Sequence, residues 1–131
     1  MYVHKNGLAR FATVPYQSPQ PSNMNNMCMH LTNYAINKES DDFVQNDDED
    51  ADDQGSKRSY KSVLDFIAEK FGQAAAKKVE QDINEIILKT VCTAQPHVLH
   101  LYRSAQPDDF ENSMCFQILG FDVMMDHKLN C

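Results

Sequence analysis

The chain has 131 residues, of which 42% are hydrophobic, and its formal net charge is −7 at pH 7. The charge is uneven, because nine of the nineteen acidic residues fall between Glu39 and Asp53, which leaves twelve basic against ten acidic residues elsewhere. No apolar run approaches the roughly 20 residues that a membrane-spanning helix needs, so we expect no such helix.

Cysteine and histidine spacings argue against a zinc site or a disulfide framework. The four cysteines are Cys28, Cys92, Cys115 and Cys131. They form no close pair of the metal-ligand type, and without a signal peptide they are expected to be reduced thiols in a cytosolic protein. His97 and His100 are three residues apart, but no carboxylate or cysteine completes a ligand set, so we interpret them as packing or surface residues.

Two short strands joined by a turn are predicted at the start of the chain. Apolar residues at 2–4 and 8–11 flank Asn6-Gly7, and this pair favours a hairpin because both residues tolerate positive φ. Arg10 would then lie on the second strand. Residues 14–26 are rich in Pro, Ser and Asn and predict a connecting loop.

Polar side chains are concentrated in residues 29–38, which read Met-His-Leu-Thr-Asn-Tyr-Ala-Ile-Asn-Lys. They supply donors, acceptors and one fixed positive charge, which suits a polyphosphate, a metal-bound nucleotide or a carboxylate. The alternative is a polar strand-to-helix connection in which Thr32 or Asn33 caps the next helix. The residues alone leave both interpretations open.

Residues 39–58 are predicted to form an acidic, disordered surface loop. The segment has no helical or strand periodicity, and a block of like charges repels itself and stays solvated. Its spacing argues against an EF-hand, because Gly55 is misplaced and no Glu follows at the required distance.

Two helices are predicted after the acidic segment. The first covers residues 59–71, with Gly72 as its C-terminal cap. The second runs from Ala74 to about Arg103, and Pro96 would kink or divide it. Its apolar stripe is interpreted as core: Val79, Ile83, Ile86, Ile87, Val91, Ala94 and Val98.

An apolar run at residues 116–125 predicts a strand covered on both faces. Asp122 interrupts this run, and a buried carboxylate must be paired, hydrogen-bonded or bound to a metal because an unpaired charge is costly in low dielectric. A structural salt bridge, for example to Arg10, and a metal site both remain open. Asp126 is predicted to be a turn residue.

Three ordered blocks, residues 6–13, 30–38 and 115–126, resemble the tubulin tyrosine ligase-like family of ATP-grasp amino-acid ligases. With Ser18-Pro-Gln-Pro-Ser22 they look closest to the polyglutamylase branch. The resemblance covers nearly the whole chain and implies an α/β (α+β) fold, in which residues 1–131 form a partial ATP-grasp-like domain with antiparallel strands and two or three helices. It also implies a domain incomplete at both ends, because the family's nucleotide-binding lysines and its Glu-x-Asn strand are missing, so the chain alone is expected to be inactive.

The resemblance also implies a mechanism, in which ATP converts a carboxylate to an acyl phosphate and the amine of an amino acid then displaces phosphate. Asp122 would hold Mg²⁺, Arg10 would face phosphate or the acyl phosphate, and Lys38 would contact substrate charge. Four residues would line the nucleotide and metal pocket: His30, Leu31, Thr32 and Asn33.

In the polyglutamylase branch, free glutamate is added to a glutamate side chain in an acidic tubulin tail. The resemblance therefore implies a tubulin or microtubule partner, a cytoplasmic and cytoskeletal location that extends to cilia, and neither a nucleic-acid nor a membrane partner. Two alternatives stay open: a catalytically inactive, truncated tubulin-binding protein, and a glycine- or tyrosine-adding ligase of the same family.

Overall fold

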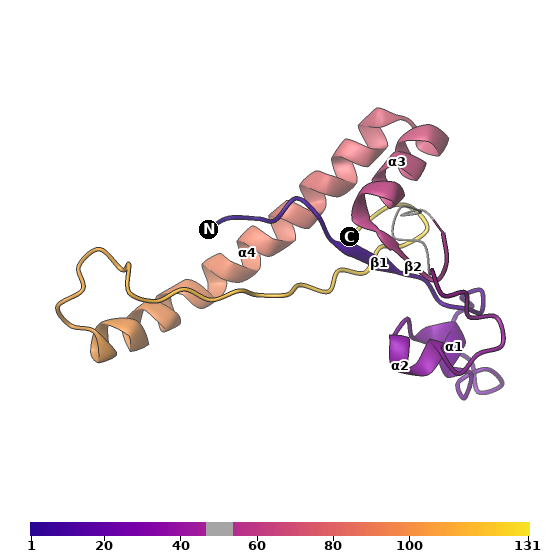
Figure 1. Cartoon of the computed structure of the whole chain (residues 1–131), viewed down its shortest axis with the longest axis horizontal. Coiled ribbons are helices and arrows are strands. Elements are labelled where there is room, and N and C mark those ends of the chain that lie inside the picture. The colour runs from indigo at the N-terminus through magenta and orange to yellow at the C-terminus, as the bar shows by residue number, and fades with distance from the viewer. Residues whose placement is uncertain (47–53) are drawn as a thin grey trace. The chain divides into compact units, whose positions relative to one another are not determined.

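The computed structural model describes residues 1–46 and 54–131. Two compact units divide the chain, Met1–Gly72 and Gln73–Cys131. The elements labelled in Figure 1 are β1 (Leu8–Arg10), α1 (Met27–His30), α2 (Tyr34–Asn37), β2 (Lys57–Ser59), α3 (Tyr60–Phe71) and α4 (Gln73–Ala105). The fold is a small α+β arrangement, which confirms antiparallel strands, while the prediction of two or three helices missed the short α1 and α2. The ATP-grasp assignment stays a prediction.

The two strands pair across a long stretch of sequence. β1 and β2 are antiparallel, with Leu8 opposite Ser59 and Arg10 opposite Lys57. The predicted hairpin was therefore wrong: residues 2–4 form no strand, and Gly7 lacks the positive φ that a tight hairpin turn requires. The carbonyl of Gly7 instead accepts a hydrogen bond from the backbone N–H of Tyr60 at 2.8 Å.

Two described residues within the predicted acidic loop, Val44 and Ser56, contact each other. The N–H of Ser56 donates to the carbonyl of Val44 at 2.9 Å, and the N–H of Val44 donates to Ser56 Oγ at 3.3 Å. Gly55 has a φ of 79°, and a Cβ there would lie 2.8 Å from the Val44 carbonyl, so this close approach requires glycine. The predicted loop over 39–58 ended too late, because β2 begins at Lys57, and the disorder predicted for 47–53 lies outside the described residues.

Helix α3 has the boundaries that its sequence predicts. Ser59 is the N-cap, and its hydroxyl accepts a hydrogen bond from the N–H of Ser62 at 3.0 Å. Gly72 ends the helix with a φ of 91°, a conformation that glycine adopts without steric cost. Ile67 is the buried residue of this helix.

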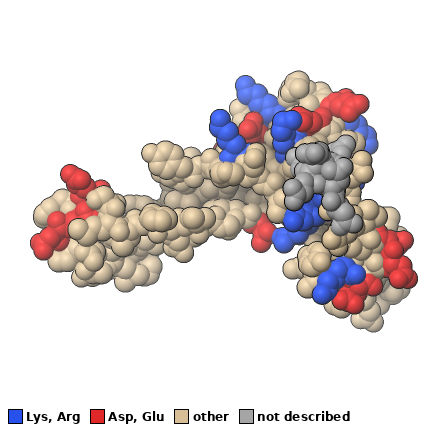
Figure 2. Space-filling model, in the orientation of Figure 1, with Lys and Arg blue, Asp and Glu red and all other residues tan. Residues whose placement is uncertain are grey.

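Helix α4 runs for 33 residues with Pro96 inside it, which confirms the predicted long helix. Its apolar stripe is core only near the N-terminus, because Val79 is 2% exposed whereas Val98 is 59% exposed. From Thr90 to Tyr102 the sequence has no charged residue, and the surface over the middle of α4 is correspondingly tan in Figure 2. Both histidines of this stretch are exposed, so of the two alternatives, packing or surface residues, the structure has surface residues.

The chain folds back after α4 around a buried carboxylate. Asp109 accepts a hydrogen bond from the Tyr102 hydroxyl and others from the backbone N–H groups of Ser113, at 2.9 Å, and Met114, at 3.2 Å. The hydrogen bond from Tyr102 lowers the pKa of Asp109 and raises the pKa of the tyrosine. Arg103 also donates to the Asp109 carbonyl at 2.9 Å, so the end of α4 and the following turn are joined.

The buried strand predicted at residues 116–125 was wrong, because these residues form no strand and most are exposed, including Phe116 at 91%. A strand needs a neighbour for its N–H and C=O groups, and no described strand pairs with this segment. The turn at Asp126 is confirmed: its carboxylate accepts from the N–H groups of Lys128 at 2.8 Å and Asn130 at 2.9 Å. Hydrogen bonding to Asn130 lowers the pKa of Asp126 to about 2. In the described part of the chain, no helix combines the length and apolar character needed to cross a membrane.

Candidate functional site

The polar stretch predicted to be a site folds as two short helices joined by an extended corner. α1 ends at His30, residues 31–33 form the corner, and α2 begins at Tyr34. Asn33 occupies the N-cap position of α2, but its side chain makes no capping hydrogen bond. The side chains of Thr32 and Asn33 are exposed, so the capping interpretation does not account for either of them.

Asn37 is the most buried residue of this stretch, at 1% exposure. Its Oδ1 accepts from the N–H of Thr13 at 2.9 Å and from the Thr13 hydroxyl at 3.0 Å. Its Nδ2 donates to the carbonyls of Leu31 at 2.7 Å and Asn33 at 3.1 Å. Asn37 therefore connects the segment after β1 to the corner at 31–33.

His30 is held by the preceding loop. Its Nε2 donates to the carbonyl of Asn23 at 3.1 Å, and the Tyr16 ring meets the imidazole edge-on with centroids 6.0 Å apart. The other ring nitrogen, Nδ1, is buried and has no hydrogen-bond partner among the described residues. A carbonyl oxygen can only accept, so Nε2 carries a proton in this arrangement.

A small cavity brings together two of the predicted site residues, Arg10 on β1 and Thr32 in the corner, with Asn37 and Lys57 also lining it. Its volume of about 20 Å³ has room for a single water molecule, so it is not a nucleotide pocket by itself. Lys57, which the sequence did not single out, lies directly opposite Arg10 in the sheet. Two cationic residues and a hydroxyl thus line one exposed edge, and such an edge suits an oxyanion.

Lys38 follows α2 and is exposed. Its ammonium lies 3.8 Å from a carboxylate oxygen of Glu39 and 6.0 Å from the centre of the Tyr34 ring. An exposed ion pair of this kind contributes little to stability. Lys38 therefore remains available to a negatively charged substrate.

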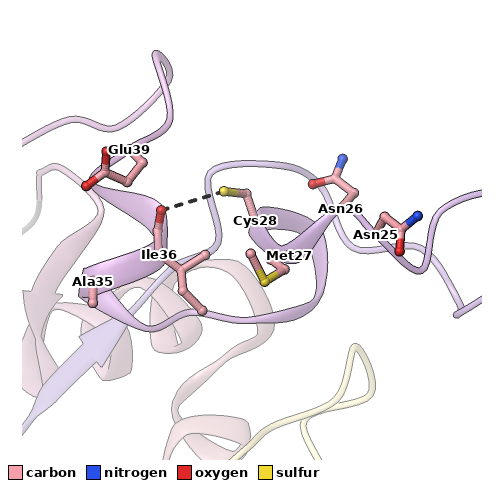
Figure 3. A pocket seen from close by; sticks show the side chains of 7 residues that line it. All are labelled: Asn25, Asn26, Met27, Cys28, Ala35, Ile36 and Glu39. Carbon is pink, nitrogen blue, oxygen red and sulfur yellow. Dashed lines mark hydrogen bonds between the residues drawn. The ribbon is translucent and has the colours of Figure 1, made fainter.

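A second cavity, of about 520 Å³, lies between α1 and α2 and is mostly apolar. Figure 3 shows its lining, in which the Cys28 thiol points toward the carbonyl of Ile36, 3.9 Å away. The lining contains none of the predicted site residues. The site predicted from the sequence and this cavity are therefore different places.

Asp122, the predicted metal ligand, belongs to the unit Gln73–Cys131 and is exposed, whereas the other predicted site residues belong to Met1–Gly72. No group of three histidine, cysteine, aspartate or glutamate side chains that could hold a metal ion occurs among residues 1–46 and 54–131. The premise that Asp122 sits in a buried strand was wrong, and its assignment to a metal rests on the resemblance alone.

The comparisons with known proteins identify the family. The model of the tubulin-tyrosine ligase family matches residues 1–131, so the chain belongs to that family.

Several curated relatives match nearly the whole chain. A "Probable beta-tubulin polyglutamylase" of Tetrahymena thermophila is 46% identical over 129 residues, which are 98% of this chain and 11% of the relative. "Tubulin polyglutamylase TTLL7" of Mus musculus and "Tubulin polyglutamylase TTLL6" of Homo sapiens are each 40% identical over 98% of this chain. The chain spans only 14% of the length of each of these two relatives.

Proposed function

We propose that the protein containing this chain is an ATP-dependent ligase that adds glutamate to glutamate side chains of tubulin tails. The observation that carries the proposal is the identity of 46% over 98% of the chain to a relative named as a beta-tubulin polyglutamylase. The names of the mouse and human relatives favour glutamate over glycine or tyrosine as the amino acid that is added.

The chemistry of the reaction explains why ATP is needed. A carboxylate is a poor electrophile, so the γ-phosphoryl group of ATP is first transferred to a carboxylate oxygen of the acceptor, which yields ADP and an acyl phosphate. The amine of free glutamate then forms the new C–N bond, and phosphate leaves with the electrons of the broken C–O bond. Positioning and charge neutralisation supply most of the catalysis in such phosphoryl transfers.

The exposed edge at β1 and the 31–33 corner suits the anionic parts of these reactants. Arg10 would face the phosphate or the acyl phosphate, since its guanidinium can donate two parallel hydrogen bonds to an oxyanion. Thr32 and Asn33 would contact the nucleotide through exposed polar side chains, and Leu31, which is also exposed, would contact it through its apolar side chain. His30 would also line the nucleotide-binding site.

Mg²⁺ is the cofactor that accompanies ATP in this proposal. Asp122 offers the hard carboxylate oxygen that Mg²⁺ prefers, and being exposed it could provide one ligand. Since no three-ligand group occurs among the described residues, a complete site needs ligands from elsewhere. When bound, the ion would neutralise charge on the phosphate oxygens.

Lys38 would contact the negative charge of the incoming glutamate or of the tubulin tail. A partner of this kind implies action at microtubules, in the cytoplasm and cytoskeleton and at the axoneme of cilia or flagella.

The proposal is tested by incubating the full-length protein with microtubules, ATP and labelled glutamate, glycine or tyrosine in parallel. We expect ATP-dependent label on tubulin from glutamate only. Incorporation of glycine or tyrosine instead would assign the protein to another activity of the family, and no incorporation of any of the three would refute ligase activity on tubulin.

A further inference from the structure

We propose that Asn37 is a positioning residue of this reaction: its buried amide fixes the segment that carries Arg10 relative to the corner that carries Thr32 and Asn33. The inference rests on the proposed function, because it concerns the same reactants, but it assigns a role to a residue that contacts none of them.

The first argument is the complete hydrogen bonding of a buried amide. An asparagine side chain has two acceptor sites on its oxygen and two donors on its nitrogen. Asn37 uses all four, two toward Thr13 and two toward the carbonyls of Leu31 and Asn33. A polar group this buried and this completely bonded holds its neighbours in one arrangement.

The Asn37 amide joins the segment that follows Arg10 to the corner that contains Thr32. Thr13 lies three residues after Arg10 along the chain, and the two carbonyls belong to the residues on either side of Thr32. Arg10, Thr32 and Asn37 line the same small cavity. The amide is therefore the bridge between the proposed phosphate contact and the proposed nucleotide contact.

Neither a carboxylate of the same shape nor an apolar side chain can make the four hydrogen bonds of the Asn37 amide. Aspartate would turn an acceptor toward two carbonyls, and leucine would leave two donors and two carbonyls without bonds. The segment after β1 is also joined to α1 by a hydrogen bond from the Val14 N–H to the Cys28 carbonyl, but this bond is long, at 3.4 Å. Loss of the amide therefore frees the corner to move, and displacement of contacts by about 1 Å is enough to slow a positioned reaction.

The test uses the full-length ligase and variants on both sides of the bridge. Thr13→Val removes the hydroxyl donor to Asn37 with little change of shape, Thr13→Ser keeps that donor, and Asn37→Ala removes all four bonds. Ile67→Val is the control, because it loses a buried methyl group in α3 at a stability cost comparable to that of one hydrogen bond. The measurements are the KM for ATP, kcat and the thermal midpoint of each variant.

We expect the KM for ATP to rise on the order of threefold in Thr13→Val and tenfold in Asn37→Ala, from the loss of one and of several hydrogen bonds. Thr13→Ser and Ile67→Val should keep the wild-type KM, although Ile67→Val lowers the thermal midpoint. If Asn37→Ala fails to fold, the KM for ATP of Thr13→Val, compared with that of Thr13→Ser, tests the positioning role.

The inference is overturned if Thr13→Val and Asn37→Ala keep the wild-type KM for ATP, or if Ile67→Val raises it equally, since the amide would then be merely structural. Both results leave the proposed function intact, because the wild-type enzyme is active in either case. An inactive wild-type enzyme refutes the proposed function, and the inference with it.

Discussion

Two valines on α4 provide a matched test of where this helix is buried. Val79 is 2% exposed and Val98 is 59% exposed, yet the sequence pattern assigns both to one core stripe. Truncating each to alanine makes the same chemical change in the same helix. Any gain in helix propensity is also the same, so it cancels when the two variants are compared.

The difference in burial sets the free-energy cost expected for each truncation. Val79→Ala removes two buried carbon atoms, worth about 0.8 kcal/mol each by transfer, and the cavity that remains raises the cost to about 2 kcal/mol. Val98→Ala removes groups that are already largely in water, so we expect no loss, or a gain of a few tenths of a kcal/mol from propensity. A gap of about 2 kcal/mol corresponds to roughly a 30-fold change in an opening equilibrium.

Amide hydrogen exchange of the 131-residue chain, followed by mass spectrometry, measures this opening directly. Exchange in the first turns of α4 should accelerate about 30-fold in Val79→Ala and stay at the wild-type rate in Val98→Ala. Equal acceleration in the two variants, or a larger effect of Val98→Ala, would show that the exposed half of the stripe is core after all and refute the reasoning.

Asp126 has a pKa of about 2, below its unfolded value, so the stability that its turn contributes is present above about pH 3.9 and disappears as the pH falls toward 2. The carboxyl ¹³C chemical shift of Asp126, followed against pH, measures this pKa. A titration midpoint near pH 4 would contradict the prediction. Ser59→Ala removes the cap of α3 and should cost about 1 kcal/mol in chemical denaturation, whereas Ser59→Asp should retain most of it. In the full-length protein, Asp122→Ala should abolish the proposed glutamate addition while Asp108→Ala leaves it near wild type, and wild-type activity of Asp122→Ala would remove Asp122 from the site.

Helices α3 and α4 were predictable because their signals are local. Ser59 and Gly72 mark the ends of α3 through bonds and backbone angles that involve only nearby residues. The strand pair was not predictable in the same way, because Arg10 pairs with Lys57, which lies near the far end of the acidic segment. Asn6-Gly7 gave a local hairpin signal that this distant pairing overrode.

The run at 116–125 shows a second limit. Hydrophobicity in the sequence indicates a segment that favours burial, but it does not say what covers it, and no described strand pairs with these residues. The expectation that Asp122 is buried failed for the same reason, since its burial was inferred from the run around it.

The roles assigned to the candidate site residues come from the resemblance, whereas the residues alone indicate only a polar region at 29–38. The density of polar residues in 29–38 left a site and a capped strand-to-helix connection open, and the structure has two short helices joined by a corner there. The sequence could not separate the exposed Thr32 and Asn33 from the buried Asn37, because these side chains have similar polarity and differ only in their partners in the fold. Lys57 was missed because its proximity to Arg10 exists only in the folded sheet.

The account is tested most directly by measuring, for the full-length protein on microtubules, the ADP released together with the mass of the tubulin tail peptides. Ligation through an acyl phosphate predicts peptides heavier by whole glutamate residues and one ADP for each residue added. ADP release without heavier peptides, or glutamate addition that proceeds without ATP, would contradict it.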